Sequence, residues 1–99
     1  MIADPTRHIA VLLVNIYIPS AQSLKDKRMV LKSLKDRVRG KFNVSIAELD
    51  REDKWQMATC GMTMIGNDQR YLDSCLQNIL SYIDSMDGFE ISDHQIEFL

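Results

Sequence analysis

Apolar residues recur along this chain with two different spacings, and the change from one spacing to the other predicts six elements. Residues 8–18 are largely apolar at both odd and even positions, which is typical of a strand in the middle of a sheet. Residues 24–39 place apolar side chains three and four positions apart, which predicts an amphipathic helix. The apolar face of that helix would consist of Leu24, Val30, Leu31, Leu34 and Val38.

The second half of the chain repeats this arrangement. Residues 42–49 and 55–65 predict two strands joined by a short charged link, which is typical of a hairpin. Apolar residues then recur at helical spacing over 68–86, and a weaker strand follows over 89–99. The side chains of 55–65 that we expect to face the core are Ala58, Cys60, Met62 and Met64.

Short signals predict where the helices begin and end. Ser23 and Asp26 have the spacing of a capping box, in which Ser23 caps the first turn and Asp26 reaches back. Gly40 follows the last apolar position of the first helix and is predicted to take the left-handed conformation that ends many helices. Asp68 is predicted to cap the second helix.

The order strand, helix, strand, strand, helix, strand predicts an α+β fold. Right-handed crossovers convert this order into a four-stranded antiparallel sheet with strand order 4-1-3-2. Both helices would cover one face of the sheet, so the other face would stay open. Val11, Leu13 and Tyr17 point to that open face, and an apolar face of this kind usually binds a partner.

Length and composition are those of one small globular domain. The chain has 99 residues, 45% of them hydrophobic, so we expect a single domain over residues 1–99. No apolar run approaches the roughly 18 residues of a membrane span, and residues 1–7 lack the features of a signal peptide. Two cysteines are too few for a disulfide scaffold, which favours a reduced, cytoplasmic protein.

The net charge of −2, from 12 basic and 14 acidic residues, argues at first against a nucleic-acid partner. However, residues 25–41 contain eight basic and two acidic residues and carry +6, which leaves −8 on the rest of the chain. Five of these bases fall within about 80° of the surface of the first helix, beside its apolar face. They are Lys25, Arg28, Lys32, Lys35 and Arg39. Such a stripe could follow several RNA phosphates, or it could be an ordinary solvated helix face.

Lys27 differs from those five bases because it lies in the middle of the apolar face of the first helix. One interpretation is a side chain that extends past the sheet edge into water. The other is a fixed cation that binds an anion at the helix start. Around the hairpin, four acidic residues lack the spacing of a calcium loop and are interpreted as a solvated turn. They are Glu48, Asp50, Glu52 and Asp53.

No residue pattern predicts a catalytic, metal or cofactor site, so we do not expect an enzyme. His8 and His94 stand alone, and Cys60 and Cys75 are predicted to be buried, inert thiols without ligand spacing. The chain has no glycine-rich phosphate loop. The open face also lacks the stacking aromatics of an RNA-recognition motif, so RNA binding by the sheet is not expected.

Four segments of the chain carry a resemblance to a known family. They are 19–28, which ends in Ser-Leu-Lys-Asp-Lys-Arg, and then 42–50, 53–56 and 66–68. Together they resemble the YlxP-like proteins, small bacterial proteins of unassigned function, over nearly the whole chain. The resemblance implies a ferredoxin-like α+β domain and no established catalytic residues. Because genes of this family often lie among genes for translation initiation and ribosome maturation, it also implies association with RNA or the ribosome.

The main functional hypothesis is a non-enzymatic accessory protein that binds RNA, a ribosome or a ribosome precursor through the first helix. The five bases of the stripe would contact phosphates, and Lys27 would anchor an anion at the helix start. The alternative is a protein-interaction module that forms a homodimer through Val11, Leu13 and Tyr17. These two hypotheses are compatible, since a dimer would present two basic helices. A third hypothesis, small-ligand sensing, rests on analogy of fold alone.

Overall fold

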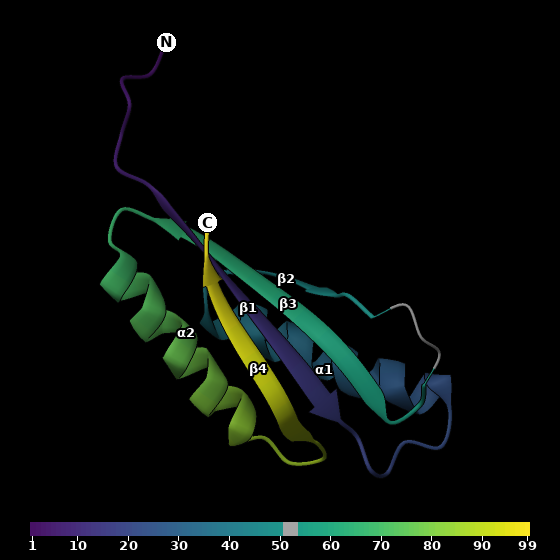
Figure 1. Cartoon of the computed structure of the whole chain (residues 1–99). Coiled ribbons are helices and arrows are strands. Elements are labelled where there is room, and N and C mark those ends of the chain that lie inside the picture. Colours follow the sequence, from purple (N-terminus) through teal and green to yellow (C-terminus); the bar gives the residue numbers. More distant parts are fainter. Residues whose placement is uncertain (51–53) are drawn as a thin grey trace.

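The computed structural model describes residues 1–50 and 54–99, which form four strands and two helices (Figure 1). Along the chain these are β1 (His8–Tyr17), α1 (Leu24–Lys41), β2 (Ser45–Glu48), β3 (Met57–Gly66), α2 (Gln69–Asp84) and β4 (Glu90–Phe98). The sheet has the order β2-β3-β1-β4, and every neighbouring pair is antiparallel. This is the order 4-1-3-2 counted from the other edge, so the predicted ferredoxin-like α+β fold is confirmed.

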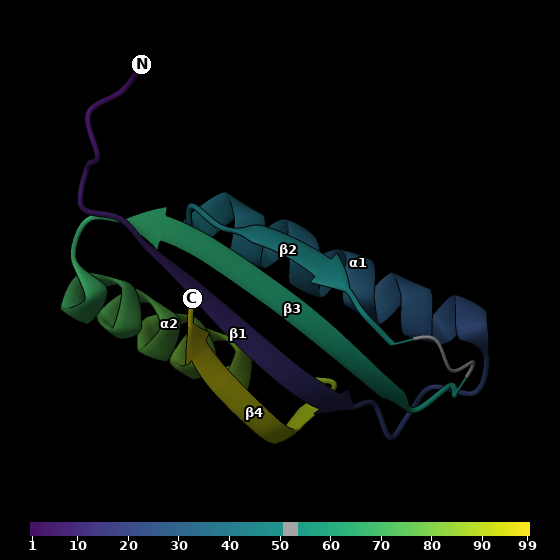
Figure 2. The same ribbon diagram turned by 45° about the horizontal axis from the view of Figure 1, so that its top comes forward.

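The middle of the fold is β1, which pairs with β3 on one side and with β4 on the other. Its even-numbered residues from Ala10 to Ile16 are fully buried, whereas its odd-numbered residues are partly exposed. Both helices lie against the buried face, and Figure 2 shows them on the same side of the sheet. The predicted arrangement of two layers with one open sheet face is therefore confirmed.

The core lies between the sheet and the two helices. Residues three and four apart on each helix point into it, as the sequence pattern predicts. The largest fully buried helix residues are Leu31, Leu34, Leu72, Leu76, Ile79 and Ile83. From β3, Ala58, Cys60 and Met62 are buried and Met64 is half-buried, again as predicted. Within the described residues, neither helix combines the length and apolarity needed to cross a membrane.

The start of α1 has the predicted cap. The Ser23 Oγ accepts a hydrogen bond from the Asp26 N–H at 3.1 Å. The Asp26 carboxylate reaches back, but it accepts from the Gln22 N–H at 3.0 Å rather than from Ser23. Two of the N–H groups near this helix end are thereby bonded, which fixes where α1 begins.

The end of α1 differs from the prediction. Gly40 does not take a left-handed conformation; it lies within α1, and the Phe42 N–H still donates to the Val38 carbonyl at 2.9 Å. Among the described glycines only Gly88 has a positive φ, of 100°, in the turn after α2. The helix continues past Gly40 because Phe42, two residues on, packs half-buried against the core. Packing of Phe42 outweighs the weak helix propensity of one glycine.

The edge strands are shorter or less regular than the pattern indicates. β2 is limited to Ser45–Glu48, because Phe42 leaves the predicted strand to pack against the core. β4 is interrupted opposite Asn15 and Ile16, where Ser92 is one extra residue. Such an irregularity twists an edge strand and hinders its pairing with another chain.

The two glycines provide a test of the corrected helix end. Gly40→Ala should stabilise the protein by about 0.5–1 kcal/mol, because alanine favours a helix and the added Cβ would meet no described atom within 4 Å beyond its chain neighbours and the nearby helix backbone. Gly88→Ala should destabilise it by about 1–2 kcal/mol, because its φ of 100° disfavours a side chain. Urea unfolding of both variants measures the two effects. Loss of stability in Gly40→Ala would contradict the assignment of Gly40 to the helix.

Candidate functional site

Five of the six predicted nucleic-acid-binding residues share one flank of α1. We name this flank the basic face of α1. It consists of Lys25, Arg28, Lys32, Lys35 and Arg39. All members are exposed except Lys35, which is half-buried. At 100° per residue, the basic face lies next to the buried residues of α1 on the helix surface. It is turned toward the edge strand β2, because Arg39 contacts that strand.

Two members of the basic face have partners within the protein. The Lys32 Nζ lies 2.7 Å from Asp36 Oδ2, and this ammonium holds the pKa of the Asp36 carboxyl below its ordinary value. Arg39 donates to the Ile46 carbonyl at 3.1 Å. In an antiparallel ladder, alternate residues of a strand direct their backbone groups to the same neighbouring strand. Leu49 bonds to β3, so the carbonyl of Ile46, three residues earlier, points away from β3, to the side of β2 that has no neighbouring strand. Arg39 therefore covers the unpaired edge of the sheet. Within residues 1–50 and 54–99, Lys25 and Arg28 form no ion pair.

Lys27, the sixth predicted residue, is not part of this surface. It is only 3% exposed and lies on the buried stripe of α1 with Leu31, Leu34 and Val38. The prediction that its side chain extends past the sheet edge into water is therefore wrong. An ammonium group at such a position needs a counter-charge, since burying an unpaired charge is very costly. This burial also leaves Lys27 unable to meet an external phosphate directly.

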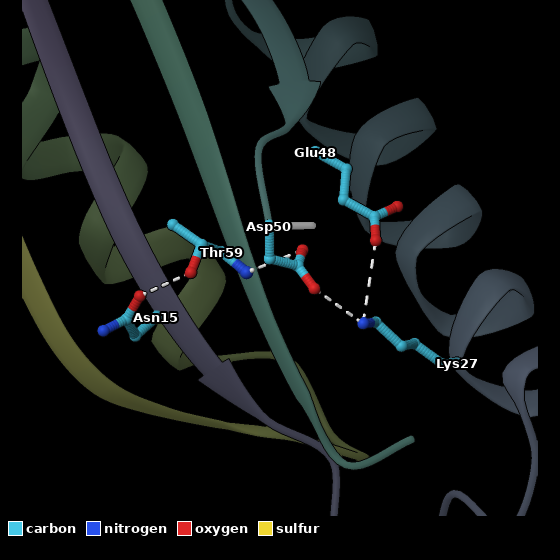
Figure 3. A network of polar contacts seen from close by, with 5 residues as sticks. All are labelled: Asn15, Lys27, Glu48, Asp50 and Thr59. Carbon is cyan, nitrogen blue, oxygen red and sulfur yellow. Dashed lines mark hydrogen bonds and ion pairs between the residues drawn. The ribbon is translucent and has the colours of Figure 1, made fainter. Parts of the chain in front are cut away.

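The counter-charge comes from Glu48, the last residue of β2, and from Asp50, two residues after it. The Lys27 Nζ lies 2.8 Å from Asp50 Oδ2 and 3.7 Å from Glu48 Oε1 (Figure 3). Asp50 Oδ1 accepts from the Thr59 N–H at 3.2 Å, and the Thr59 hydroxyl donates to Asn15 Oδ1 at 2.8 Å. We name these five residues the Lys27 network. It links the start of α1 to β2, β3 and β1 in one chain of polar contacts.

Asp50 also explains why β2 ends where it does. The Leu49 N–H still bonds to the Thr59 carbonyl at 2.7 Å, but the Thr59 N–H bonds to the Asp50 carboxylate. A side chain thus replaces the backbone acceptor that would extend the ladder. The interpretation of the acidic cluster as a solvated turn is wrong for Asp50, whose side chain is 15% exposed. Glu48, another member of the cluster, has a side chain that is 33% exposed and faces Lys27. The remaining two members, Glu52 and Asp53, lie outside the described residues.

The electrostatics of the Lys27 network favour its charged form. Partial burial raises the pKa of the Asp50 carboxyl, but the bonds from Lys27 and from the Thr59 N–H outweigh burial and hold that pKa below its ordinary value. In the described part of the chain, no buried side-chain nitrogen or oxygen lacks a hydrogen-bond partner. Lys27, Asp50 and Thr59 are thus bonded to one another, while Glu48 lies 3.7 Å from the Lys27 Nζ with its side chain 33% exposed. The role of the network is to position α1.

The open sheet face carries the second predicted surface. Val11, Leu13 and Tyr17 are half-buried on it, as expected for residues without a covering layer. Neighbouring apolar side chains on the same face are more exposed: Ile9 38%, Met57 39%, Leu49 49% and Ile65 69%. A hollow of about 220 Å³ lies among Val11, Leu13, Ala47, Leu49, Gly61 and Thr63. By register, the open-face positions of β1, β2 and β3 include no charged residue.

Of the two cysteines, only Cys60 is buried as predicted. Burial raises the pKa of the Cys60 thiol to about 11, so it stays protonated at neutral pH. Cys75 is half-buried on α2. Among residues 1–50 and 54–99 there is no group of three histidine, cysteine, aspartate or glutamate side chains arranged to hold a metal ion.

Sequence reasoning missed the partners of Lys27, although a signal was present. A lysine in the centre of an apolar helix face requires a buried carboxylate, and Asp50 closes the strand that follows α1. It also missed a pair of cations on the opposite flank of α1. Arg37 and Lys41 lie over the ring of Tyr82 from α2, a contact that no spacing within one helix could reveal.

A double-mutant cycle measures the buried ion pair. Asp50→Asn keeps an acceptor for the Thr59 N–H but leaves Lys27 without its nearest charge, so we expect a loss of about 2–3 kcal/mol. Lys27→Met in the same background should restore part of that loss, with a coupling of at least about 1 kcal/mol. Urea unfolding supplies the four free energies. The exposed pair Lys32 and Asp36, put through the same cycle, should show much weaker coupling.

The coupling should also depend on pH. Because the pKa of Asp50 is lower in the folded protein than its ordinary 3.8, the ion pair contributes fully above that value. Its contribution is lost as the pH falls below 3.8 through the lowered pKa of the folded state. Additive effects of the two substitutions at neutral pH would contradict an energetic role for the pair.

Comparison with known proteins places this chain in a family. Residues 9–96 match the family described as "Protein of unknown function (DUF503)". The chain is 41% identical over 73 residues to the "Uncharacterized protein YlxP" of Bacillus subtilis (strain 168), which covers 74% of this chain and 79% of that protein. Among solved structures it is similar to "De novo designed protein Foldit4", with a TM-score of 0.48 and 15% identity over 93% of each chain. The family match and the identity to YlxP confirm the resemblance found in the sequence, and this chain belongs to the DUF503 family of proteins of unknown function.

Proposed function

We propose that this protein binds RNA, as a non-enzymatic accessory protein, through the basic face of α1. The observation that carries the proposal is the separation of charge along the chain. Residues 25–41 hold +6 and the remainder −8, and five of the bases share one flank of a single helix. An anionic polymer would be attracted to that flank and repelled from the acidic remainder.

The dimensions of the basic face suit a phosphate backbone. From Lys25 to Arg39 the helix rises about 21 Å at 1.5 Å per residue, which is long enough to follow several phosphates. Lys25 and Arg28 stand at the start of α1, where the helix dipole also favours an anion. The Lys32–Asp36 pair is exposed, and exposed ion pairs are weak, so Lys32 can exchange its partner for a phosphate.

The Lys27 network supports this function indirectly. By holding Lys27 against Asp50, it fixes the rotation of α1 about its own axis. The basic face therefore stays turned toward the β2 edge and away from the core. Contacts made by such a face would be to the backbone of the RNA and would carry little sequence information.

Salt-dependent binding to an RNA hairpin tests the proposal. With three to five phosphate contacts on the duplex stem, the affinity should fall roughly 40- to 500-fold between 50 and 200 mM KCl. Lys25→Glu combined with Arg28→Glu should weaken binding at 50 mM KCl by at least about tenfold. Glutamate is favoured near a helix start, so this variant should remain folded. Fluorescence anisotropy of a labelled hairpin measures both effects.

The matched control carries the same change of net charge elsewhere. Arg7→Glu combined with Arg70→Glu alters two exposed bases outside α1, one of them also near a helix start. This control should bind almost as the unaltered protein does. Equal loss of affinity in both double variants would show that net charge alone governs binding, and a flat salt response would remove the proposal.

A second candidate function is homodimer formation through the open sheet face. It is favoured by four exposed apolar residues on that face, Ile9, Leu49, Met57 and Ile65, and by the uncharged hollow beside them. Apolar surface of this kind gains from burial. By register, β4 places Glu90, Asp93 and Glu97 on the same face, so two copies would meet over β1, β2 and β3, where the outward positions are uncharged. Occupation of this face would leave α1 in the other layer accessible to RNA.

Sedimentation velocity of an exposed-residue variant tests the dimer. Ile65, which is 69% exposed, can be changed to aspartate with little effect on the fold, whereas two such charges would oppose association. We expect a dimer for the unaltered protein and a monomer for Ile65→Asp. Met29→Asp, at a 63% exposed position on α1, should stay dimeric. A monomer at every concentration of the unaltered protein would exclude this function.

A further inference from the structure

Two cations and two aromatic rings meet where the end of α1 approaches α2. The Lys41 Nζ lies 4.3 Å from the centroid of the Tyr82 ring and 5.9 Å from that of Phe42. The Arg37 Cζ lies 6.0 Å from the Tyr82 centroid. We name these four residues the Tyr82 cluster. They come from the last turns of α1, the residue after it, and the last turns of α2.

The rings of the Tyr82 cluster are held in place by the protein itself. Tyr82 and Phe42 are half-buried and pack against the core. Their centroids are 5.7 Å apart and their planes meet at 64°, which is a favourable edge-to-face contact. Because the ring is already fixed, stacking of a planar ligand on it would cost little additional side-chain entropy.

The cations of the cluster, in contrast, are exposed. Arg37 and Lys41 form no ion pair among the residues that the structure describes. The acidic residues of α2, Asp73 and Asp84, lie about 180° and 160° from Tyr82 on the helix surface, at 100° per residue. Two positive charges therefore lie close to one aromatic ring, and an anion attached to a flat ring would suit both features.

We propose that the Tyr82 cluster binds an unpaired base of single-stranded RNA, which stacks on Tyr82 while Arg37 and Lys41 bond to the adjacent phosphate. This inference rests on the proposed function and names the form of RNA that the protein prefers. Base stacking on an aromatic ring is stronger than an exposed contact between a cation and a ring, so an arriving base displaces the Lys41 ammonium. The displaced ammonium remains beside the ring and can bond to the phosphate.

The position of the cluster suits a strand that also follows the basic face. The two surfaces lie on opposite flanks of α1, with Arg39 on one flank and Lys41 on the other. Gly40 lies between them on the helix surface, and apart from its chain neighbours and the nearby helix backbone no described atom comes within 4 Å of where its Cβ would be. An RNA backbone can therefore cross α1 at Gly40 and pass from the basic face to Tyr82. A continuous duplex, whose bases are paired, would use the basic face alone.

Binding of one strand in two forms tests the inference. The probe is a labelled 16-nucleotide RNA of mixed sequence, used alone and annealed to its complement, with anisotropy as the readout. Tyr82→Leu removes the ring and should weaken single-strand binding about 5- to 150-fold, the range measured for loss of one stacked base. Duplex binding should change less than about twofold. Tyr82→Phe keeps the ring and should bind both forms as the unaltered protein does.

Further variants separate the failure of this inference from the failure of RNA binding itself. Arg37→Gln with Lys41→Gln changes only exposed side chains, so it should stay folded, and it should weaken single-strand binding more than duplex binding. Thermal unfolding establishes that Tyr82→Leu is folded at the assay temperature. Equal binding of the single strand by Tyr82→Leu and the unaltered protein would overturn the inference and leave the basic face as the RNA site. Equal losses for both RNA forms would also overturn it. No binding of either form by the unaltered protein would overturn both proposals.

Discussion

The orientation of α1 depends on one buried ion pair, between Lys27 and Asp50. Lys27 occupies a position on the helix that would otherwise hold an apolar residue, four residues before Leu31. Its charge is tolerated there because Asp50 lies 2.8 Å away and is itself bonded to β3. An apolar residue at position 27 could pack in several rotations of the helix, whereas an ammonium needs its carboxylate in one direction. The pair therefore exchanges some stability for a defined placement of the helix.

A defined placement of α1 keeps the two surfaces of the protein distinct. The basic face turns toward the β2 edge, and the open face of β1, β2 and β3 carries no charge at its outward positions. RNA on the helix layer and a second copy on the sheet would then occupy different sides of a thin, two-layer domain (Figure 2). The near-neutral net charge of −2 hides this separation, because it sums a basic helix and an acidic remainder.

The sequence was sufficient for the fold and for the basic face, because both follow from short-range periodicity. Strand order, helix positions and the Ser23 cap needed only local patterns and the handedness of crossovers. Gly40 was misjudged because packing of Phe42, a tertiary effect, extends the helix past a residue that often ends one. Lys27 was misjudged because its partner lies 23 residues away at a strand end, beyond any helical spacing. The Tyr82 cluster likewise joins two helices, so periodicity within either one does not reveal it.

The central claim is that the helix layer, and not the sheet, meets RNA. Two-dimensional NMR of the ¹⁵N-labelled protein, titrated with a short single-stranded RNA at low salt, tests this claim most directly. We expect the largest shifts on α1 amides between Lys25 and Lys41 and near Tyr82, and little change on the strands of the open face. Shifts concentrated on β1 and β3, or no shifts at any RNA concentration, would contradict this claim.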